Sequence, residues 1–298
     1  MLIMSAMPRW IKMRAKVVGA AAVTAAGALA VGTLLWNRTT RRSVKRLTSR
    51  SPARIGDGNK DHHAFFSREH FAPLPAPVAR YFAFALRDGQ SLIRSATLRQ
   101  TGILRASADA TWMPFSAVEH FTVRSPGFIW DARCRIAPLV SIRIRDSYIR
   151  GAGASEARLT GLIRLGRQSD TPEVAAASLV RYLAEAAWIP TALLPGEGVT
   201  WTEVDHTTAR ATLTDLETTV WIDVQFGEHG GIERVSTMRY RDVNGSLVRT
   251  PWIGYFRDYA CTQGMMIPMA ADVQWGLPEG ALSVWRGRIL TAEYQFMS

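Results

Sequence analysis

The sequence predicts a mainly β fold (α+β): a single curved antiparallel sheet, or half-open β-barrel, with a lid helix and an N-terminal transmembrane helix. Three observations lead to this prediction. Apolar and polar residues alternate with period two in many segments, which is typical of strands with one buried face. One amphipathic segment interrupts these strands at mid-chain. One uncharged apolar run near the N-terminus is long enough to cross a bilayer.

The apolar run occupies residues 17–36 (VVGAAAVTAAGALAVGTLLW). As a helix it spans roughly 30 Å, about the thickness of a hydrocarbon core. Trp10 and Trp36 flank the run, as interfacial anchors do. The alternative is a cleaved signal peptide with its processing site at residues 28–30. Apolar character continues past that site to Trp36, so we predict a retained anchor.

Positive charge is concentrated at the same end of the chain. Residues 1–54 hold eleven Lys and Arg and no Asp or Glu, which leaves 25 basic and 25 acidic residues for the remainder. The basic excess therefore belongs to the segments around the apolar run. A nucleic-acid-binding domain needs a basic patch of its own, so we predict no nucleic-acid partner. Residues 38–54 are expected to bind anionic membrane lipid, or to form a solvated linker.

The chain divides into four predicted segments. They are a basic N-terminal segment (1–16), a transmembrane anchor (17–36), a basic and polar linker (37–66) and an antiparallel β half-barrel domain (67–298). The side of the membrane that the domain faces stays open. More basic residues follow the anchor than precede it, which favours the cytoplasm. Cys134 and Cys261 do not decide the side, because they pair after export or remain thiols inside the cell.

Strands are predicted where apolar residues alternate with polar ones. Clear cases are residues 128–136, 140–145, 220–226 and 284–296. In the last of these, Leu290 is expected on the apolar face. Turns between strands are supplied by residues 228–231 and 244–245, since glycine tolerates positive φ. Many strands joined by short links predict an antiparallel meander with one apolar face.

Two segments break the alternation and are predicted to be helices. Residues 75–86 open on prolines and carry an apolar stripe. Residues 172–188 follow Thr171, a capping residue, and end before Pro190. The second helix is expected to lie as a lid over the concave face of the sheet, with its polar face turned away. The hollow beneath is then either filled by side chains or left open for an acyl chain.

The polar face of this lid helix is predicted to hold Ser178, Arg181 and Glu185. Tryptophan is frequent, with ten in the chain. On a β scaffold, tryptophans pack into the core or line a groove for a hydrophobic ligand. Tryptophans of the body and apolar residues of the lid segment are therefore the candidate ligand-binding residues: Trp130, Leu183, Trp188, Leu193, Leu194, Trp221 and Trp252.

Four carboxylates are candidate functional groups: Asp131, Asp146, Glu185 and Asp258. A carboxyl group buried beside aromatic rings has a raised pKa and acts as an acid or a base. Two such groups about 5–9 Å apart suit glycoside hydrolysis. The alternative is that these carboxylates form ion pairs with the arginines that lie close to them in sequence.

The sequence carries none of the common phosphate-binding, nucleophile or zinc motifs. His62, His63 and His70 fall in or near the linker, where nothing fixes the geometry of metal ligands. We therefore predict no catalytic residues, no cofactor and no metal.

Three phrases carry a resemblance to a family. Residues 74–82 (LPAPVARYF), 126–132 (PGFIWDA) and 181–195 (RYLAEAAWIPTALLP) resemble the hallmarks of a bacterial family of membrane-anchored proteins with a domain of unknown function. The resemblance covers about residues 68–296 and implies a bacterial inner-membrane location. It implies no particular activity and no catalytic residues.

The order of strands, one mid-chain helix and further strands is also similar to the LolA/LolB-like lipoprotein carriers. That resemblance implies a half-open barrel that holds acyl chains, and it favours an extracytoplasmic domain.

Three functions follow as hypotheses. The first is a membrane-tethered protein without catalytic activity that binds a lipid or a lipoprotein acyl chain. The second is a structural envelope protein that docks a partner. The third is a carboxylate-dependent enzyme that acts on a glycan or a lipid.

Overall fold

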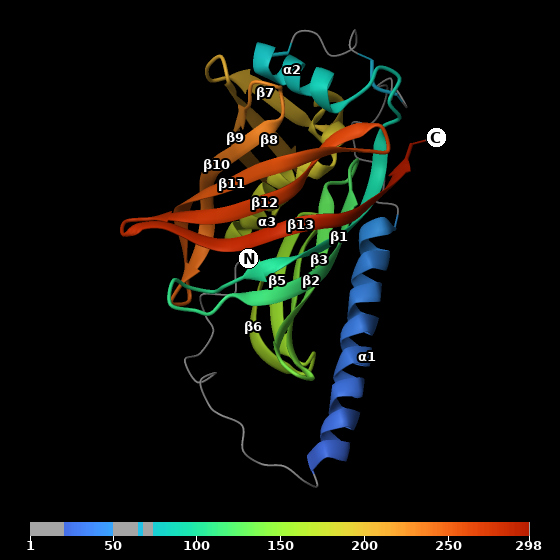
Figure 1. Ribbon diagram of the computed structural model, residues 1–298, viewed down its shortest axis with the longest axis vertical. Coiled ribbons are helices and arrows are strands. Elements are labelled where there is room, and N and C mark those ends of the chain that lie inside the picture. The colour runs from blue at the N-terminus through green and yellow to red at the C-terminus, as the bar shows by residue number, and fades with distance from the viewer. Residues whose placement is uncertain (1–20, 50–64, 68–73, 298) are drawn as a thin grey trace.

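Thirteen strands form one continuous antiparallel sheet in the described part of the chain, and the sheet curls into a half-barrel (Figure 1). The computed structural model describes residues 21–49, 65–67 and 74–297. The strand order is β6-β5-β4-β3-β2-β1-β13-β12-β11-β10-β9-β8-β7. Two meanders, β1–β6 and β7–β13, therefore join where the first strand pairs with the last. The mainly β fold predicted from the sequence is confirmed.

The bounds of the elements follow the alternation and turn signals of the sequence closely. The helices are α1 (Ala21–Thr48), α2 (Ala76–Ala85) and α3 (Pro172–Glu185), and short 3₁₀ turns follow α3. The strands are β1 (Ile93–Leu104), β2 (Met113–Thr122), β3 (Gly127–Ala137), β4 (Val140–Ile149), β5 (Ala152–Leu159), β6 (Ile163–Ser169), β7 (Val199–Glu203), β8 (Thr208–Asp215), β9 (Thr218–Phe226), β10 (Ile232–Val243), β11 (Ser246–Thr262), β12 (Met265–Leu277) and β13 (Gly280–Phe296).

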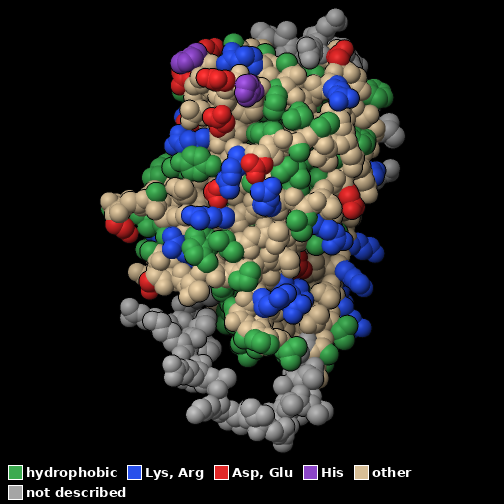
Figure 2. All heavy atoms as spheres, in the orientation of Figure 1, with side chains coloured by type: hydrophobic (Ala, Val, Ile, Leu, Met, Phe, Trp, Pro, Cys, Tyr) green, Lys and Arg blue, Asp and Glu red, His purple; other side chains and the backbone are tan. Residues whose placement is uncertain are grey.

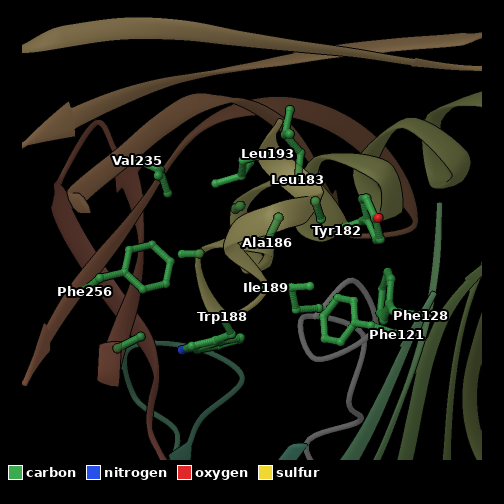
Figure 3. Close-up of a cluster of buried hydrophobic side chains, with 14 of the residues drawn as sticks. Phe121, Phe128, Tyr182, Leu183, Ala186, Trp188, Ile189, Leu193, Val235 and Phe256 are labelled. Carbon is green, nitrogen blue, oxygen red and sulfur yellow. The ribbon is translucent and has the colours of Figure 1, made fainter. Parts of the chain in front are cut away.

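Helix α3 connects the two edges of the sheet. It follows β6 and precedes β7, and these are the two edge strands. The chain therefore passes from one edge to the other here, and the contacts of α3 with β4, β5, β9 and β10 place this crossing on the concave side of the curl. Thr171 caps the helix, because its side chain accepts a hydrogen bond from the Val174 N–H at 3.3 Å. Figure 3 shows the segment after α3 held between Phe256 of β11 and Phe121 and Phe128 of the opposite wing.

Both faces of α3 are buried, which differs from the predicted lid with a polar outer face. Ser178 and Arg181 are among its buried residues. The reason is that the helix lies inside the curl, with β4 and β5 on one side and β9 and β10 on the other. One strand position also differs from prediction. Leu290 is 59% exposed, because a register shift between β1 and β13 reverses the alternation there.

Helix α1 runs along the outside of the sheet (Figure 1). It continues without a break across the predicted boundary between anchor and linker at residue 36. Trp36, predicted at a membrane interface, is only 1% exposed and packs against the folded domain. Residues 17–20 of the predicted anchor lie outside the described residues. Among the helices that the structure describes, none is long and apolar enough to cross a membrane.

Candidate functional site

Arg181 of α3 is buried in the hollow of the sheet and contacts three carboxyl groups. Its Nη1 donates to Asp146 Oδ2 at 2.7 Å, and its Nη2 donates to Glu119 Oε1 at 3.2 Å. Its Nε donates to Glu185 Oε1 at 2.9 Å, one helical turn away. The helix is thereby attached to β2 and β4 through one guanidinium group. We call Glu119, Asp146, Arg181 and Glu185 the Arg181 cluster.

Aromatic and amide side chains complete the surroundings of this cluster. The Arg181 guanidinium carbon lies 5.0 Å from the centre of the Phe128 ring and 4.9 Å from that of Trp130. Gln100 donates from Nε2 to Glu119 Oε2 at 2.6 Å and accepts the Trp130 indole N–H at 2.8 Å. Because each of these polar groups has a partner, their burial is compensated.

Burial raises the pKa of Glu119 well above its usual range, and the nearby Glu185 raises it further, whereas Arg181 and Gln100 lower it. The Glu119 carboxyl group is hydrogen-bonded to that of Glu185, a contact that favours the protonated form of Glu119. Arg181 forms ion pairs with the two neighbouring carboxylates, those of Asp146 and Glu185. A second buried arginine, Arg239, lies close enough to both carboxylates that their charges act to raise its pKa.

A small cavity lies between α3 and the middle strands of the half-barrel. Its volume is about 40 Å³, room for roughly three water molecules. The hollow predicted from the sequence is thus mostly filled by side chains. Five tryptophans are among the lining residues, which are Trp130, Arg181, Ala184, Glu185, Trp188, Arg239, Trp252, Gly254, Phe256, Ala271, Asp272, Val273, Trp275, Val284 and Trp285.

Two side chains at this cavity, Trp252 and Arg239, make fewer hydrogen bonds than their N–H groups allow. The indole N–H of Trp252 is buried and has no hydrogen-bond partner among the described residues. Arg239 is 3% exposed, and its Nε donates to the Ala177 carbonyl at 2.9 Å. No carboxylate of the described residues lies within 4.0 Å of its guanidinium, which instead lies 5.4 Å from the Trp252 ring and 5.9 Å from the Trp275 ring.

Burial lowers the pKa of Arg239 to about 10, and repulsion from Arg181 also lowers it, while Asp146 and Glu185 oppose the shift. The guanidinium therefore still carries its charge at neutral pH. A buried cation without a paired anion is unfavourable unless a further group compensates it.

A groove leads from the surface to the same arginine. Strand β10 pairs with β9 only as far as Ser236, and from there the two strands separate. A groove of about 230 Å³ lies in this gap, and Arg239 lines both the groove and the cavity. The groove is bounded by Ala176, Ala177, Val180, Thr219, Val220, Trp221, Thr237, Met238, Tyr240 and Arg249.

The candidate ligand-binding residues are only partly brought together. Trp130, Trp188 and Trp252 line the cavity. Trp221 lines the groove, and the Arg210 guanidinium lies 3.9 Å from its ring centre. The three leucines of the set (Leu183, Leu193 and Leu194) are buried in the core but do not line the cavity.

The four candidate carboxylates are divided between different faces of the sheet. Asp146 and Glu185 meet at Arg181 in the interior. Asp131 lies on the outer face, where it accepts hydrogen bonds from α1. Asp258 is half-exposed and pairs with Arg288 at 3.0 Å. Asp146, Glu185 and Asp258 therefore form ion pairs, whereas the hydrogen-bond donors to Asp131 are the uncharged side chains of Trp36 and Thr40.

Sequence reasoning missed Glu119, Arg239, Trp275 and Trp285. The burial of Glu119 could have been predicted from strand alternation, because Glu119 lies on the same face as the apolar Ala117 and Phe121 of its strand. The role of Arg239 had no such signal, since it depends on where β10 leaves β9.

Cys134 and Cys261 are both free thiols, the first buried and the second exposed. The described residues contain no group of three or more His, Cys, Asp and Glu placed to hold a metal. His62, His63 and His70 lie outside the described part of the chain.

These features define a single-sheet antiparallel half-barrel that encloses a helix and a buried charged cluster. The chain belongs to a family of unknown function, DUF6920, which matches residues 72–294. No curated protein matches the sequence.

Two solved structures are similar in architecture. A LolA superfamily protein from Nitrosomonas europaea is 10% identical with a TM-score of 0.40, over 74% of this chain and 93% of that one. A DUF1329 family protein from Desulfovibrio piger is 12% identical with a TM-score of 0.39, over 68% of this chain and 86% of that one. Scores of this size carry no argument about function.

Proposed function

We propose that this protein is a membrane-tethered binding protein for an amphiphile, such as a lipid or a lipoprotein acyl chain, and that it has no catalytic activity. The observation that carries the proposal is the pairing of an aromatic cavity with a buried arginine, Arg239, that has no direct ion-pair partner among the described residues. Five tryptophans surround the apolar part of the cavity, and Arg239 and the free Trp252 N–H lie at its polar side. An apolar chain ending in an anionic head matches both parts.

The anionic head supplies a direct ion-pair partner for Arg239, whose one printed hydrogen bond goes to the Ala177 carbonyl. A carboxylate or phosphate at Arg239 forms charge-assisted hydrogen bonds in a site from which water is largely excluded. The groove between β9 and β10 gives such a head a path to Arg239 from the surface. The acyl chain then extends among the tryptophans on the other side of the guanidinium.

Binding requires the cavity to widen. Small-molecule pockets have volumes of roughly 300–1,000 Å³, whereas this cavity has about 40 Å³. In this proposal, the part of the cavity wall that moves is the C-terminal end of α3 and the turn after it. Ala184, Glu185 and Trp188 line the cavity from this side. The contacts of Arg181 with Asp146 and Glu119 hold the preceding turn of the helix in place while this end moves.

Native mass spectrometry of the full chain, released from detergent, tests the proposal. We expect a bound amphiphile whose identity is then read from lipid extraction. Arg239→Met is expected to lose the adduct, and Arg234→Met, on the same strand but away from the cavity, is expected to keep it. A chain that carries no adduct and takes up none from added fatty acid or phospholipid contradicts the proposal.

The carboxylate-enzyme hypothesis has less support in the geometry. Glu119 and Glu185 are hydrogen-bonded neighbours, closer than the roughly 5–9 Å that glycoside hydrolysis uses. Glu119 is fully buried and does not line the cavity. Asp131 and Asp258 lie on other surfaces, so the candidate carboxylates do not converge on one cavity.

A further inference from the structure

Four arginines form a row across the outer face of one wing of the sheet. Arg133 of β3 is directly opposite Arg143 of β4, Arg143 is opposite Arg158 of β5, and Arg158 is opposite Arg164 of β6. Like charges directly opposite one another on neighbouring strands are destabilising. We call these four residues the arginine row.

The adjacent row on the same face shows that this wing can balance charge. There Asp131, Arg145, Glu156 and Arg167 are opposite one another in turn, so that the signs alternate. Glu156 pairs with Arg145 at 3.0 Å and with Arg158 at 2.6 Å. Within the described residues, Arg133 and Arg143 have no carboxylate at ion-pair distance. Glu156 also lies 3.9 Å from Arg164, so three arginines share this one carboxylate and the arginine row is only partly compensated.

Helix α1 adds more positive charge beside this face. Its exposed residues include Arg38, Arg41, Arg42, Lys45 and Arg46, and no acidic residue occurs before residue 54. The domain as a whole has balanced charge, but the strand pairing gathers part of its positive charge on this one face. The structure places the basic helix and the arginine row on the same side of the molecule.

An apolar edge borders this basic face. The β3–β4 and β5–β6 turns are neighbours, since the Thr160 N–H donates to the Ser141 carbonyl at 2.7 Å. Leu139 in the first turn is 78% exposed, and Ile163 after the second is 58% exposed. Figure 2 shows hydrophobic side chains gathered at the lower end of the molecule, with Lys and Arg above them. Such a patch, rimmed by charge, marks an interaction surface.

The first part of α1 reaches the same edge. A Cβ on Gly32 would lie 2.5 Å from the Thr160 carbonyl oxygen, so helix and turn are in backbone contact. Val31, Leu34 and Leu35 are exposed beside this contact. Exposed apolar side chains from a helix and two hairpins thus lie together, next to arginines from the same elements.

We propose that this surface docks on the headgroup layer of an anionic lipid membrane, with Leu139 and Ile163 entering the interface and the arginine row contacting lipid phosphates. Charge complementarity and the apolar edge support this occupant. Exposed leucines and isoleucine enter the acyl boundary, and arginines beside them attract anionic headgroups. A nucleic acid matches the arginines but leaves the apolar edge unexplained. The contact fixes the orientation of the half-barrel on the membrane.

The test uses the full chain with Cys261→Ser, carrying an environment-sensitive fluorophore on Leu139→Cys. The matched control is Leu216→Cys. Leu216 is also a leucine with positive φ in a tight turn, 59% exposed, but it lies beside Gly151 at the opposite end of the strands. Ile163→Cys is a second reporter if the first variant fails to fold. Protein is reconstituted in vesicles of phosphatidylcholine with or without phosphatidylglycerol.

We expect the label at residue 139 to shift to shorter wavelength and to be quenched by lipids spin-labelled in the acyl chain, only when phosphatidylglycerol is present. The label at residue 216 should not respond. Arg133→Gln with Arg164→Gln should remove most of the response, since each arginine contributes roughly a fivefold change in local partitioning. Equal responses at both positions, or in neutral vesicles, overturn the proposal. So does duplex DNA that binds this face and loses affinity in the arginine variants while the lipid response is unchanged.

Discussion

Trp36 donates its indole N–H to both carboxylate oxygens of Asp131, at 2.9 and 3.0 Å, and so joins α1 to the outer face of β3. Thr40 donates to the same carboxylate at 2.6 Å. The Arg145 guanidinium lies 4.5 Å from the centre of the Trp36 ring. The Asp131 carboxylate and the Arg145 guanidinium of the sheet therefore hold α1 at Trp36 and Thr40.

Trp36→Phe is expected to loosen α1 without unfolding the sheet. The substitution removes a charge-assisted hydrogen bond, worth about 1.5–3 kcal/mol, and leaves the ring contact. Amide hydrogen exchange over residues 39–48 should become at least tenfold faster. Trp201→Phe is the control, because it also loses an indole hydrogen bond, to the Leu193 carbonyl at 2.9 Å, but in the other wing. Unchanged exchange in α1 would mean that the contact does not hold the helix.

Arg181→Met is expected to destabilise the whole domain. It leaves Asp146 and Glu185 buried without their shared cation, which costs about 3–5 kcal/mol. Urea unfolding of the full chain measures the change. Arg210→Met is the control, because the half-exposed pair of Arg210 with Asp223 should contribute no more than about 1 kcal/mol. Equal changes in the free energy of unfolding for the two variants would show that the Arg181 cluster contributes no more to stability than a surface ion pair.

The raised pKa of Glu119 makes stability depend on pH in a defined direction. In the unfolded chain the carboxyl group releases its proton near its ordinary pKa of about 4.3, whereas the folded protein retains it. The stabilising contribution is thus complete below that ordinary pKa and is lost as pH rises toward the folded-state pKa. Glu119→Gln cannot ionise, so its free energy of unfolding should fall less from pH 5 to pH 9. A steeper fall in this variant than in the native protein contradicts the assignment.

The two cysteines should differ sharply in reactivity. Burial, with a smaller effect from Asp146, raises the pKa of Cys134 to about 12, so almost no thiolate forms at neutral pH. Cys261 is exposed. A thiol reagent should therefore modify one cysteine per folded chain and two after denaturation, and Cys261→Ser should reduce the folded count to zero. Rapid modification of both thiols in the folded chain would show that the buried face of β3 is accessible to the reagent.

Most of the fold could be predicted from the alternation of apolar and polar residues along the strands. The inward positions of β3, such as Trp130 and Cys134, follow directly from the sequence and are buried in the structure. Helix α3 shows where such reasoning stops. Its apolar and polar stripes predict one buried and one exposed face, but it connects the two edge strands and so crosses the hollow. A polar stripe that includes Arg181 is then buried, and it is compensated by carboxyl groups from distant strands.

Register was the missing information for the charged surfaces. The sequence shows Arg133 and Arg143 as polar positions of two strands, and their total charge is balanced elsewhere in the domain. Only the pairing of β3 with β4, and of β4 with β5, places arginine opposite arginine. Similarly, Arg239 becomes a candidate binding residue because β10 separates from β9 beside it.

The most direct test of the interior binding site is a fluorescence titration of the full chain with a bromine-substituted fatty acid, which quenches tryptophans in contact with its chain. The account predicts saturable quenching, because five tryptophans line the cavity. Trp252→Phe should weaken binding roughly fivefold by removing the unpaired N–H donor, and Trp112→Phe, outside the cavity, should not. Ala271→Phe, which fills the cavity, should abolish it. Quenching that fails to saturate, or that persists unchanged in Ala271→Phe, would contradict the account.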